Sequence, residues 1–122
     1  MKPEAVLQRA VVQLLAIYAG RGLLAFCHVP NGGYRTPAEG GMFKSFGVKA
    51  GVPDLLIWSA GGGHFGVELK ATSRGLSPAQ ADWHATMAAM GHRVYVVRSV
   101  DELEAVLRRE GVPKVGRLEA AE

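Results

Sequence analysis

Two short apolar runs joined by a glycine-rich link constrain the fold of this chain more than any other feature. The runs are "DLLIW" (54–58) and "FGVELK" (65–70), and the residues between them are "SAGGGH". Such runs predict strands, and a short link rich in glycine favours an antiparallel hairpin. Both strands nevertheless carry charge, because Asp54 opens the first and Glu68 and Lys70 end the second. Charges are costly to bury unless they are paired, so their presence here suggests a functional site.

Helix and strand signals on both sides of the hairpin predict a mixed sheet flanked by helices, in the order αβββαβα. Proline and glycine delimit the first helix, and Ser77 followed by Pro78 begins a later one. Ser99 and Glu102 match a capping box. The expected elements are a helix over 3–19, a strand over 23–29, the two hairpin strands, a helix over 77–91, a strand over 94–97 and a helix over 99–110. The segment 30–53 is rich in Gly and Pro and is expected to be irregular, with one short helical turn around 42–46.

The chain has 122 residues, which suits one domain over 1–110 with a single core and a polar tail over 111–122. No apolar run approaches the roughly 20 residues that span a bilayer, so we expect no membrane partner. Cys27 is the only cysteine, and no disulfide can form within the chain. A reducing, cytoplasmic location is therefore expected. The net charge of +3 is compatible with a polyanionic partner but does not identify one.

The charged residues of the hairpin form the candidate site. Glu68 and Lys70 share one face of their strand, since alternate residues point the same way. Counting back from the centre of the link places Asp54 opposite about residue 69, so an offset of one residue is needed to bring it beside Glu68 or Lys70. Two carboxylates held that close favour a hard cation such as Mg²⁺ or Mn²⁺, and the chemistry that this suggests is phosphodiester hydrolysis. The alternative is an exposed salt bridge at a strand edge.

Several motifs together resemble the PD-(D/E)xK nuclease superfamily and, within it, the virus-type replication-repair nuclease (VRR-NUC) family. They are "HVPNGG" (28–33), "GVKAGVPD" (47–54), "GVELK" (66–70) and "GLSPAQADWH" (75–84), together with a glutamate on the first helix. The resemblance extends from about Glu4 to Leu107. It implies a restriction-endonuclease-like αβββαβ core, which agrees with the predicted order of elements.

The resemblance also implies roles for individual residues. Asp54 and Glu68 would ligate a divalent metal together with the backbone carbonyl of Leu69, and Lys70 would position or activate the attacking water. Gln80 corresponds to a glutamine that supports the active site. Glu4 could bind a second ion or a metal-bound water, or could simply be a charge at the start of a helix, and Gln8 is a weaker candidate one turn further on.

Glycines and cations near these motifs are candidates for contact with DNA. The glycines permit a close approach of the backbone, and an arginine can form paired hydrogen bonds with a phosphate. The candidate DNA-binding residues are His28, Asn31, Gly32, Gly33, Arg35, Lys44, Lys49 and Arg74. Other residues are expected to be structural: Cys27 as a small buried residue, Trp58 and Trp83 in packing, Met87 and Met90 in the core or an interface. His64, His84 and His92 lack the spacing of metal ligands.

The predicted function is a metal-dependent DNA endonuclease. The family implies a homodimer acting on branched DNA such as four-way junctions, in replication, recombination or repair, and stand-alone members resemble phage or mobile-element proteins. Two alternatives stay open: a flap or nicking nuclease, and a catalytically idle subunit that binds nucleic acid. A Schiff-base or general-base role for Lys70 is disfavoured, because two neighbouring acids would hold its proton.

Overall fold

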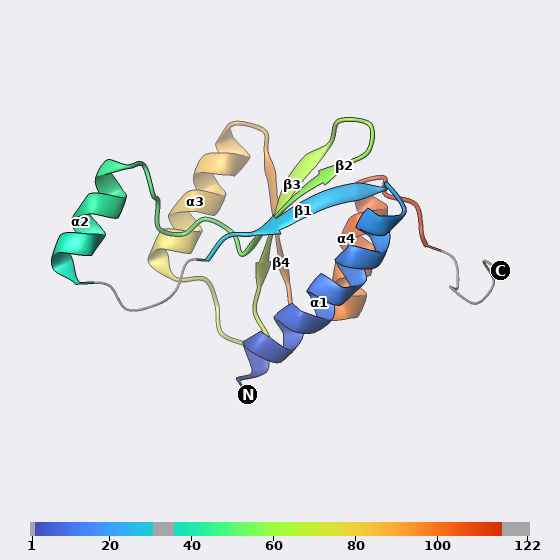
Figure 1. Ribbon diagram of the computed structural model, residues 1–122, viewed down its shortest axis with the longest axis horizontal. Coiled ribbons are helices and arrows are strands. Elements are labelled where there is room, and N and C mark those ends of the chain that lie inside the picture. Colours follow the sequence, from blue (N-terminus) through green and yellow to red (C-terminus); the bar gives the residue numbers. More distant parts are fainter. Residues whose placement is uncertain (1, 31–35, 116–122) are drawn as a thin grey trace.

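The computed structural model describes residues 2–30 and 36–115, which form four helices and four strands (Figure 1). The elements are α1 (Pro3–Gly20), β1 (Leu24–His28), α2 (Pro37–Ser45), β2 (Leu55–Ser59), β3 (His64–Leu69), α3 (Pro78–Ala89), β4 (Arg93–Val97) and α4 (Val100–Arg109). The predicted order of elements is confirmed, and α2 is an addition to it.

The four strands form one mixed sheet in the order β1-β2-β3-β4. β1 pairs antiparallel with β2, and β2 pairs antiparallel with β3 through the predicted glycine-rich hairpin. β4 lies parallel to β3, and α3 makes the connection between them. This arrangement places the end of β3, the start of β2 and the start of α3 close to one another, because a parallel connection returns the chain along the same sheet.

The main core lies between one face of the sheet and helices α1 and α4. Alternate strand residues point to this face, as a period of two requires. α1 contributes a stripe at helical spacing, and α4 contributes a shorter one. The buried residues include Leu7, Val11, Leu15 and Tyr18 of α1, Leu55 and Ile57 of β2, Phe65, Val67 and Leu69 of β3, and Leu103 and Leu107 of α4. α3 covers the opposite face beside β4, as Figure 1 shows.

The helix starts follow the sequence signals, with two differences. Ser77 caps α3 in a full capping box with Gln80. Ser99 caps α4 through the N–H of Glu102, but the Glu102 carboxylate accepts from the N–H of Arg98 and not from that of Ser99, so the predicted capping box is incomplete. The expected short turn around 42–46 is instead the nine-residue helix α2, which begins at a capping box of Thr36 and Glu39.

Three further expectations about packing differ from the structure. Cys27 was expected to be buried but is exposed, because β1 is an edge strand and Cys27 points away from the α1–α4 face. Trp58 was expected to pack in the protein but is 43% exposed and stacks on the ring of His64. Val112 lies in the core, so the packed domain extends beyond the expected boundary at residue 110. No described helix is long and apolar enough to cross a bilayer.

Candidate active site

Asp54 and Glu68 are neighbours across the β2–β3 ladder. Leu55 pairs with Val67 and Leu56 pairs with Gly66, so one further step places Asp54 opposite Glu68. Counting from the sequence placed Asp54 opposite residue 69, one residue away from this register. Because directly opposed residues project to the same face, the observed register brings the two carboxylates together without a bulge.

Hydrogen bonds from two other strands fix the position of Asp54. Its Oδ2 accepts from the backbone N–H of Leu69 at 2.7 Å. Its carbonyl oxygen accepts from the N–H of Val29 at 2.8 Å and lies 2.9 Å from Nδ1 of His28. A carbonyl oxygen can only accept, so Nδ1 of His28 carries the proton. The Asp54 side chain is therefore held at the junction of β1, β2 and β3.

Glu68 is a buried carboxyl group with one partner and one unpaired oxygen. It is 2% exposed, and its Oε2 accepts from Nε2 of Gln80 at 3.0 Å. Its Oε1 is buried without a hydrogen-bond partner. Burial, and then the adjacent Asp54 carboxylate, raise the pKa of Glu68 to about 8, while Lys70 acts in the opposite direction. Two carboxyl groups this close do not both ionise readily unless a cation joins them.

Lys70 follows β3 and is 8% exposed. Its backbone N–H donates to the carbonyl of Val97 at 3.0 Å, which extends the parallel pairing with β4 by one residue. Its ammonium group favours the ionised form of Glu68 and lowers the pKa of His84 on α3. Lys70 thus acts electrostatically on both the carboxylate pair and α3, and it shares its sheet face with Glu68.

The start of α3 is positioned by close packing as well as by its cap. The backbone of Gly51 adopts a φ of +87°, and a β-carbon there would overlap the carbonyl oxygen of Ala79 in the first turn of α3. Only glycine combines this conformation with this contact at no cost. Gly66 on β3 also requires a small residue, because a β-carbon would lie 2.9 Å from Cγ of the buried Pro53. The segment before Asp54 is thus packed against the helix that carries Gln80.

Glu4 lies near the carboxylate pair but does not join it in a three-acid cluster. Its charge contributes to the raised pKa of Glu68. No group of three or more His, Cys, Asp or Glu side chains able to hold a metal occurs among residues 2–30 and 36–115. Glu4 also lines a cavity of about 330 Å³ with Lys2, Pro3, Thr72 and Arg74. Gln8, the weaker candidate, is half-buried on the next turn of α1.

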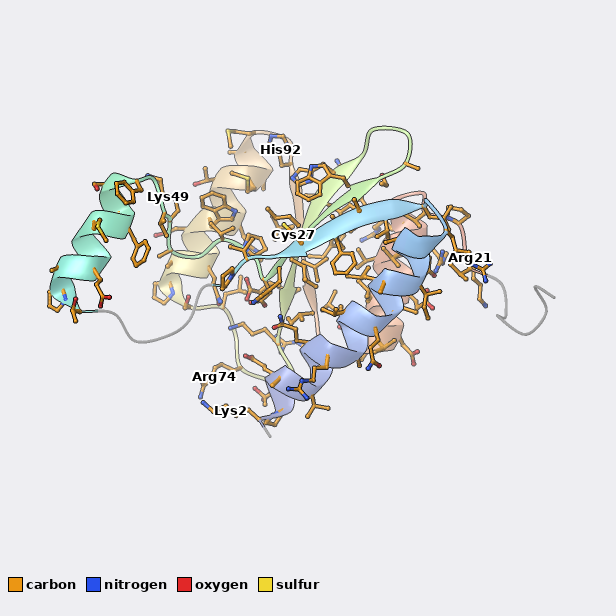
Figure 2. All side chains as sticks on the ribbon, viewed as in Figure 1. Lys2, Arg21, Cys27, Lys49, Arg74 and His92 are labelled. Carbon is orange, nitrogen blue, oxygen red and sulfur yellow. The ribbon has the colours of Figure 1, made fainter. Side chains whose placement is uncertain are left out.

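The candidate DNA-binding residues are distributed over the molecule. Arg74 lies beside Lys2 at the start of α1, whereas Lys49 lies after α2 on the far side of α3 (Figure 2). Lys44 is exposed on α2, and His28 is exposed at the end of β1, next to Asp54. Asn31, Gly32, Gly33 and Arg35 lie outside the described residues.

Sequence reasoning missed two residues near this site. Lys2 shares the cavity with Glu4 and Arg74. Its position immediately before Pro3, at the start of the first helix and close to Glu4, was the sequence signal that could have pointed to it. His84 was set aside because the histidines lack metal-ligand spacing. It nevertheless follows Gln80 by four residues, and residues at that spacing lie on the same face of a helix.

The residues present fit a hard divalent cation. Carboxylate oxygens are the preferred ligands of Mg²⁺ and Mn²⁺, and one buried oxygen of Glu68 lacks a partner that a cation would supply. Burial, and then the neighbouring Asp54, raise the pKa of Glu68, and a bound cation would offset both by favouring the ionised carboxylate. With two carboxylates only, the rest of a coordination shell would come from backbone carbonyl groups, water or substrate.

Comparison with known proteins identifies the family. The family model of the VRR-NUC domain matches residues 3–101. The chain belongs to the VRR-NUC family. This family consists of nucleases of the PD-(D/E)xK type, so the chain carries a nuclease domain. A solved structure titled "VRR_NUC domain protein" is similar to it, with 22% identity, a TM-score of 0.65 and coverage of 89% of this chain and 88% of that one. That likeness supports the fold. No curated protein matches the chain closely enough to count as a relative.

Proposed function

We propose that this VRR-NUC protein is a divalent-metal-dependent endonuclease that hydrolyses phosphodiester bonds in branched DNA. The observation that carries the proposal is the opposition of Asp54 and Glu68, with Lys70 on the same face. Two acids and a lysine on one sheet face are costly to maintain for stability alone, since replacing buried charges by apolar residues is often neutral or stabilising. A site that must hold a cation against a phosphate explains why they are present.

In this proposal each residue has a separate task. Asp54 and Glu68 hold the cation, with the carbonyl of Leu69 as a further ligand. When bound, Mg²⁺ or Mn²⁺ supplies Lewis-acid polarisation of the scissile phosphate. Lys70 orients the attacking water and stabilises the negative charge that develops on the phosphate. Gln80 keeps Glu68 oriented through their hydrogen bond of 3.0 Å.

Cations around the site support DNA as the substrate. Arg98 donates to the carbonyl groups of Thr72 and Arg74, which fixes the loop after β3 against the end of β4. This loop presents Arg74 beside Lys2 in the cavity that Glu4 also lines. A phosphate group next to the scissile one would meet two positive charges there, and phosphate contacts fix the register of nucleic acid on a protein.

We further propose that the protein acts as a homodimer, because cutting both strands of a four-way junction requires two active sites. An exposed apolar surface that a dimer could cover supports this. α2 packs against no other described helix or strand and stands away from the sheet (Figure 1). Met42 is 49% exposed and Phe46 is 73% exposed. Large exposed apolar side chains on a helix and at its end are typical of an interaction surface.

A panel of labelled substrates tests the function. It contains four-way junctions, flaps, nicked duplexes, intact duplexes and single strands, each incubated with Mg²⁺, Mn²⁺ or EDTA. We expect metal-dependent cleavage that is strongest on the junction and is lost in Asp54→Ala. Preference for flaps or nicked duplexes would favour the simpler nuclease. Binding without cleavage on every substrate would favour the idle subunit, and absence of Mn²⁺ binding by calorimetry would contradict the metal site.

Sedimentation of the wild type and of Phe46→Asp tests the dimer. We expect the wild type to sediment as a dimer and the variant as a monomer with the circular dichroism spectrum of the folded protein, because a charge on an exposed residue disrupts an interface without disturbing the fold. A wild-type monomer over the whole micromolar concentration range would contradict the dimer.

A further inference from the structure

Two buried polar atoms among the described residues lack a hydrogen-bond partner, and the charge of Lys70 acts on both of the residues that carry them. They are Oε1 of Glu68 and Nε2 of His84. Buried polar groups in folded proteins are nearly always hydrogen-bonded, so each exception needs an explanation. A cation accounts for the Glu68 oxygen. It does not account for the imidazole, because no third metal-ligating side chain joins the carboxylate pair in the described part of the chain.

The position of His84 follows from α3. Gln80 donates to Glu68 from the first turn of this helix, and His84 lies one turn later on the same face. Trp83 and Met87 face a separate apolar cavity between α3 and the sheet, together with Leu56, Gly66 and Val94. The face of α3 that looks toward the sheet therefore has two parts. One is apolar and faces the cavity, and the other is polar, with Gln80 bonded to Glu68 and His84 one turn further on.

His84 and Lys70 have complementary hydrogen-bonding capacity. Burial, and then the charge of Lys70, lower the pKa of His84, so the imidazole is neutral and one of its nitrogens can accept. The Lys70 ammonium has three N–H donors and donates none of them to another described residue. A neutral acceptor can hold an ammonium without adding a charge that would compete for the cation.

We propose that His84 is a positioning residue for Lys70: when a cation occupies the carboxylate pair, its Nε2, which has no partner in this structure, accepts a hydrogen bond from the Lys70 ammonium, directly or through one water molecule. This inference rests on the proposed function for its catalytic consequence. A lysine side chain has considerable rotamer freedom. Once a cation neutralises Asp54 and Glu68, these acids attract the ammonium much less. His84 then keeps Lys70 directed at the phosphate.

A set of three substitutions separates this role from simple packing. His84→Leu removes the acceptor. His84→Gln places its side-chain amide near the position of Nε2. The shorter side chain of His84→Asn places its amide near the position of Nδ1 instead. His92→Leu, at an exposed histidine just after α3, is the matched control. For each variant we would measure the melting temperature, the single-turnover cleavage rate with Mg²⁺ and the Kd for the junction with Ca²⁺.

We expect His84→Leu and His84→Asn to lower the single-turnover rate by about 10- to 100-fold, the usual range for loss of a supporting hydrogen bond at a metal site. The Kd and melting temperature should stay unchanged, and His84→Gln should recover most of the rate. Wild-type rates in His84→Leu, or a rate in His84→Gln as low as in His84→Leu, would overturn the inference. So would a loss of DNA affinity at an unchanged rate, because His84 would then contact DNA.

A second measurement does not depend on nuclease activity. Acetylation of Lys70 by acetic anhydride in the presence of Ca²⁺ and without DNA, followed by mass spectrometry, reports how accessible its amine is, with exposed Lys49 as the internal reference. We expect His84→Leu to accelerate Lys70 acetylation several-fold and His84→Gln to leave it near the wild-type rate. If the protein cleaves DNA but Lys70 is acetylated equally fast in all variants, the role of His84 is rejected and the nuclease function stands. If the acetylation rates differ as expected but the protein cleaves no DNA, the nuclease function is rejected and the contact between His84 and Lys70 stands.

Discussion

Gln80 uses both ends of its side-chain amide, donating from Nε2 to Oε2 of Glu68 at 3.0 Å and accepting at Oε1 from the backbone N–H of Ser77 at 2.9 Å. One residue therefore caps α3 and orients a proposed metal ligand. Because the capping box is local, the orientation of Glu68 is linked directly to the first turn of this helix. A substitution can separate the two tasks.

Gln80→Glu should keep the cap and lose the support of Glu68. A glutamate at this position completes a capping box as well as a glutamine does, but it cannot donate to Glu68 and adds a third negative charge beside it. We expect the melting temperature in the presence of Mg²⁺ to stay close to that of the wild type and the cleavage rate to fall by about 10- to 100-fold. Gln80→Ala, which loses both contacts, should lower both quantities. A fully active Gln80→Glu would show that the hydrogen bond to Glu68 is dispensable.

The raised pKa of Glu68 predicts how the stability of the metal-free protein depends on pH. In the unfolded chain Glu68 releases its proton near pH 4.5, whereas in the folded protein it keeps the proton until about pH 8. Between these values the folded state binds more protons, so the free energy of unfolding falls as pH rises from about 4.5 to 8. Glu68→Gln removes this contribution and should melt above the wild type at pH 8 but not at pH 5.

The comparison with Glu68→Gln is needed because His84 changes the free energy of unfolding with pH in the opposite direction. Its pKa is lowered by folding, so its contribution to stability grows as pH rises toward 6.5. Mn²⁺ should raise the melting temperature of the wild type more at pH 8 than at pH 5, since it binds the ionised carboxylates. Identical pH profiles for the wild type and Glu68→Gln would show that Glu68 ionises normally.

The strands and helices could be predicted from sequence because their signals are local, but their exact register could not. Strand runs, a glycine-rich link and the Ser77–Pro78 start of α3 each depend on neighbouring residues. The opposition of Asp54 and Glu68 depends on where the hairpin turns, and a one-residue change of register moves every side chain to the other face. Counting from the middle of "SAGGGH" cannot determine this, whereas the packing of Gly66 against Pro53 can.

The environment of the site was harder to predict than its central residues. Asp54, Glu68, Lys70 and Gln80 belong to recognisable motifs, but His84 and Lys2 reach the site only through the placement of α3 and α1 on the sheet. The helix α2 carried a usable signal in "TPAE", where Thr36 and Glu39 form a capping box. The glycines around it concealed that signal, because Gly40 and Gly41 disfavour a helix by intrinsic propensity.

Lys70→Ala should abolish cleavage and leave DNA binding intact. The proposed role of the ammonium is to act on the water and the phosphate during reaction, so its loss affects the transition state more than the bound state. Cleavage of labelled junctions with Mg²⁺ and binding with Ca²⁺ measure the two separately. Cleavage by this variant at the wild-type rate would exclude the assigned role.

Glu4→Ala should reduce cleavage less than Asp54→Ala does. Glu4 influences Glu68 through its charge and lies outside the opposed pair, whereas Asp54 accepts from the backbone of the strand that carries Glu68. Rates of the two variants on the same junction, over a range of Mn²⁺ concentrations, make the comparison. An equal loss in both would place Glu4 among the direct metal ligands.

Gly51→Ala should destabilise the protein because it affects both the backbone and the packing against α3. A φ of +87° is unfavourable for alanine, and the new β-carbon would overlap the carbonyl of Ala79. We expect a loss of about 1–3 kcal/mol in the free energy of unfolding, together with lower activity, because the start of α3 must shift. Gly75→Ala is the control, since a β-carbon there has nothing within 4 Å. Equal stability of the two variants in urea denaturation would contradict the packing argument.

Lys2 and Arg74 should contribute phosphate contacts that salt weakens. Both line the cavity next to Glu4, and neither forms an ion pair with another described residue. Each phosphate contact releases about one counterion, so each loss should reduce the slope of log K against log salt by about 1. We therefore expect Lys2→Ala with Arg74→Ala to reduce this slope by about 2 and to weaken binding equally for different sequences. Arg109→Ala, on the exposed side of α4, should leave the slope unchanged, and an unchanged slope in the double variant would place the DNA elsewhere.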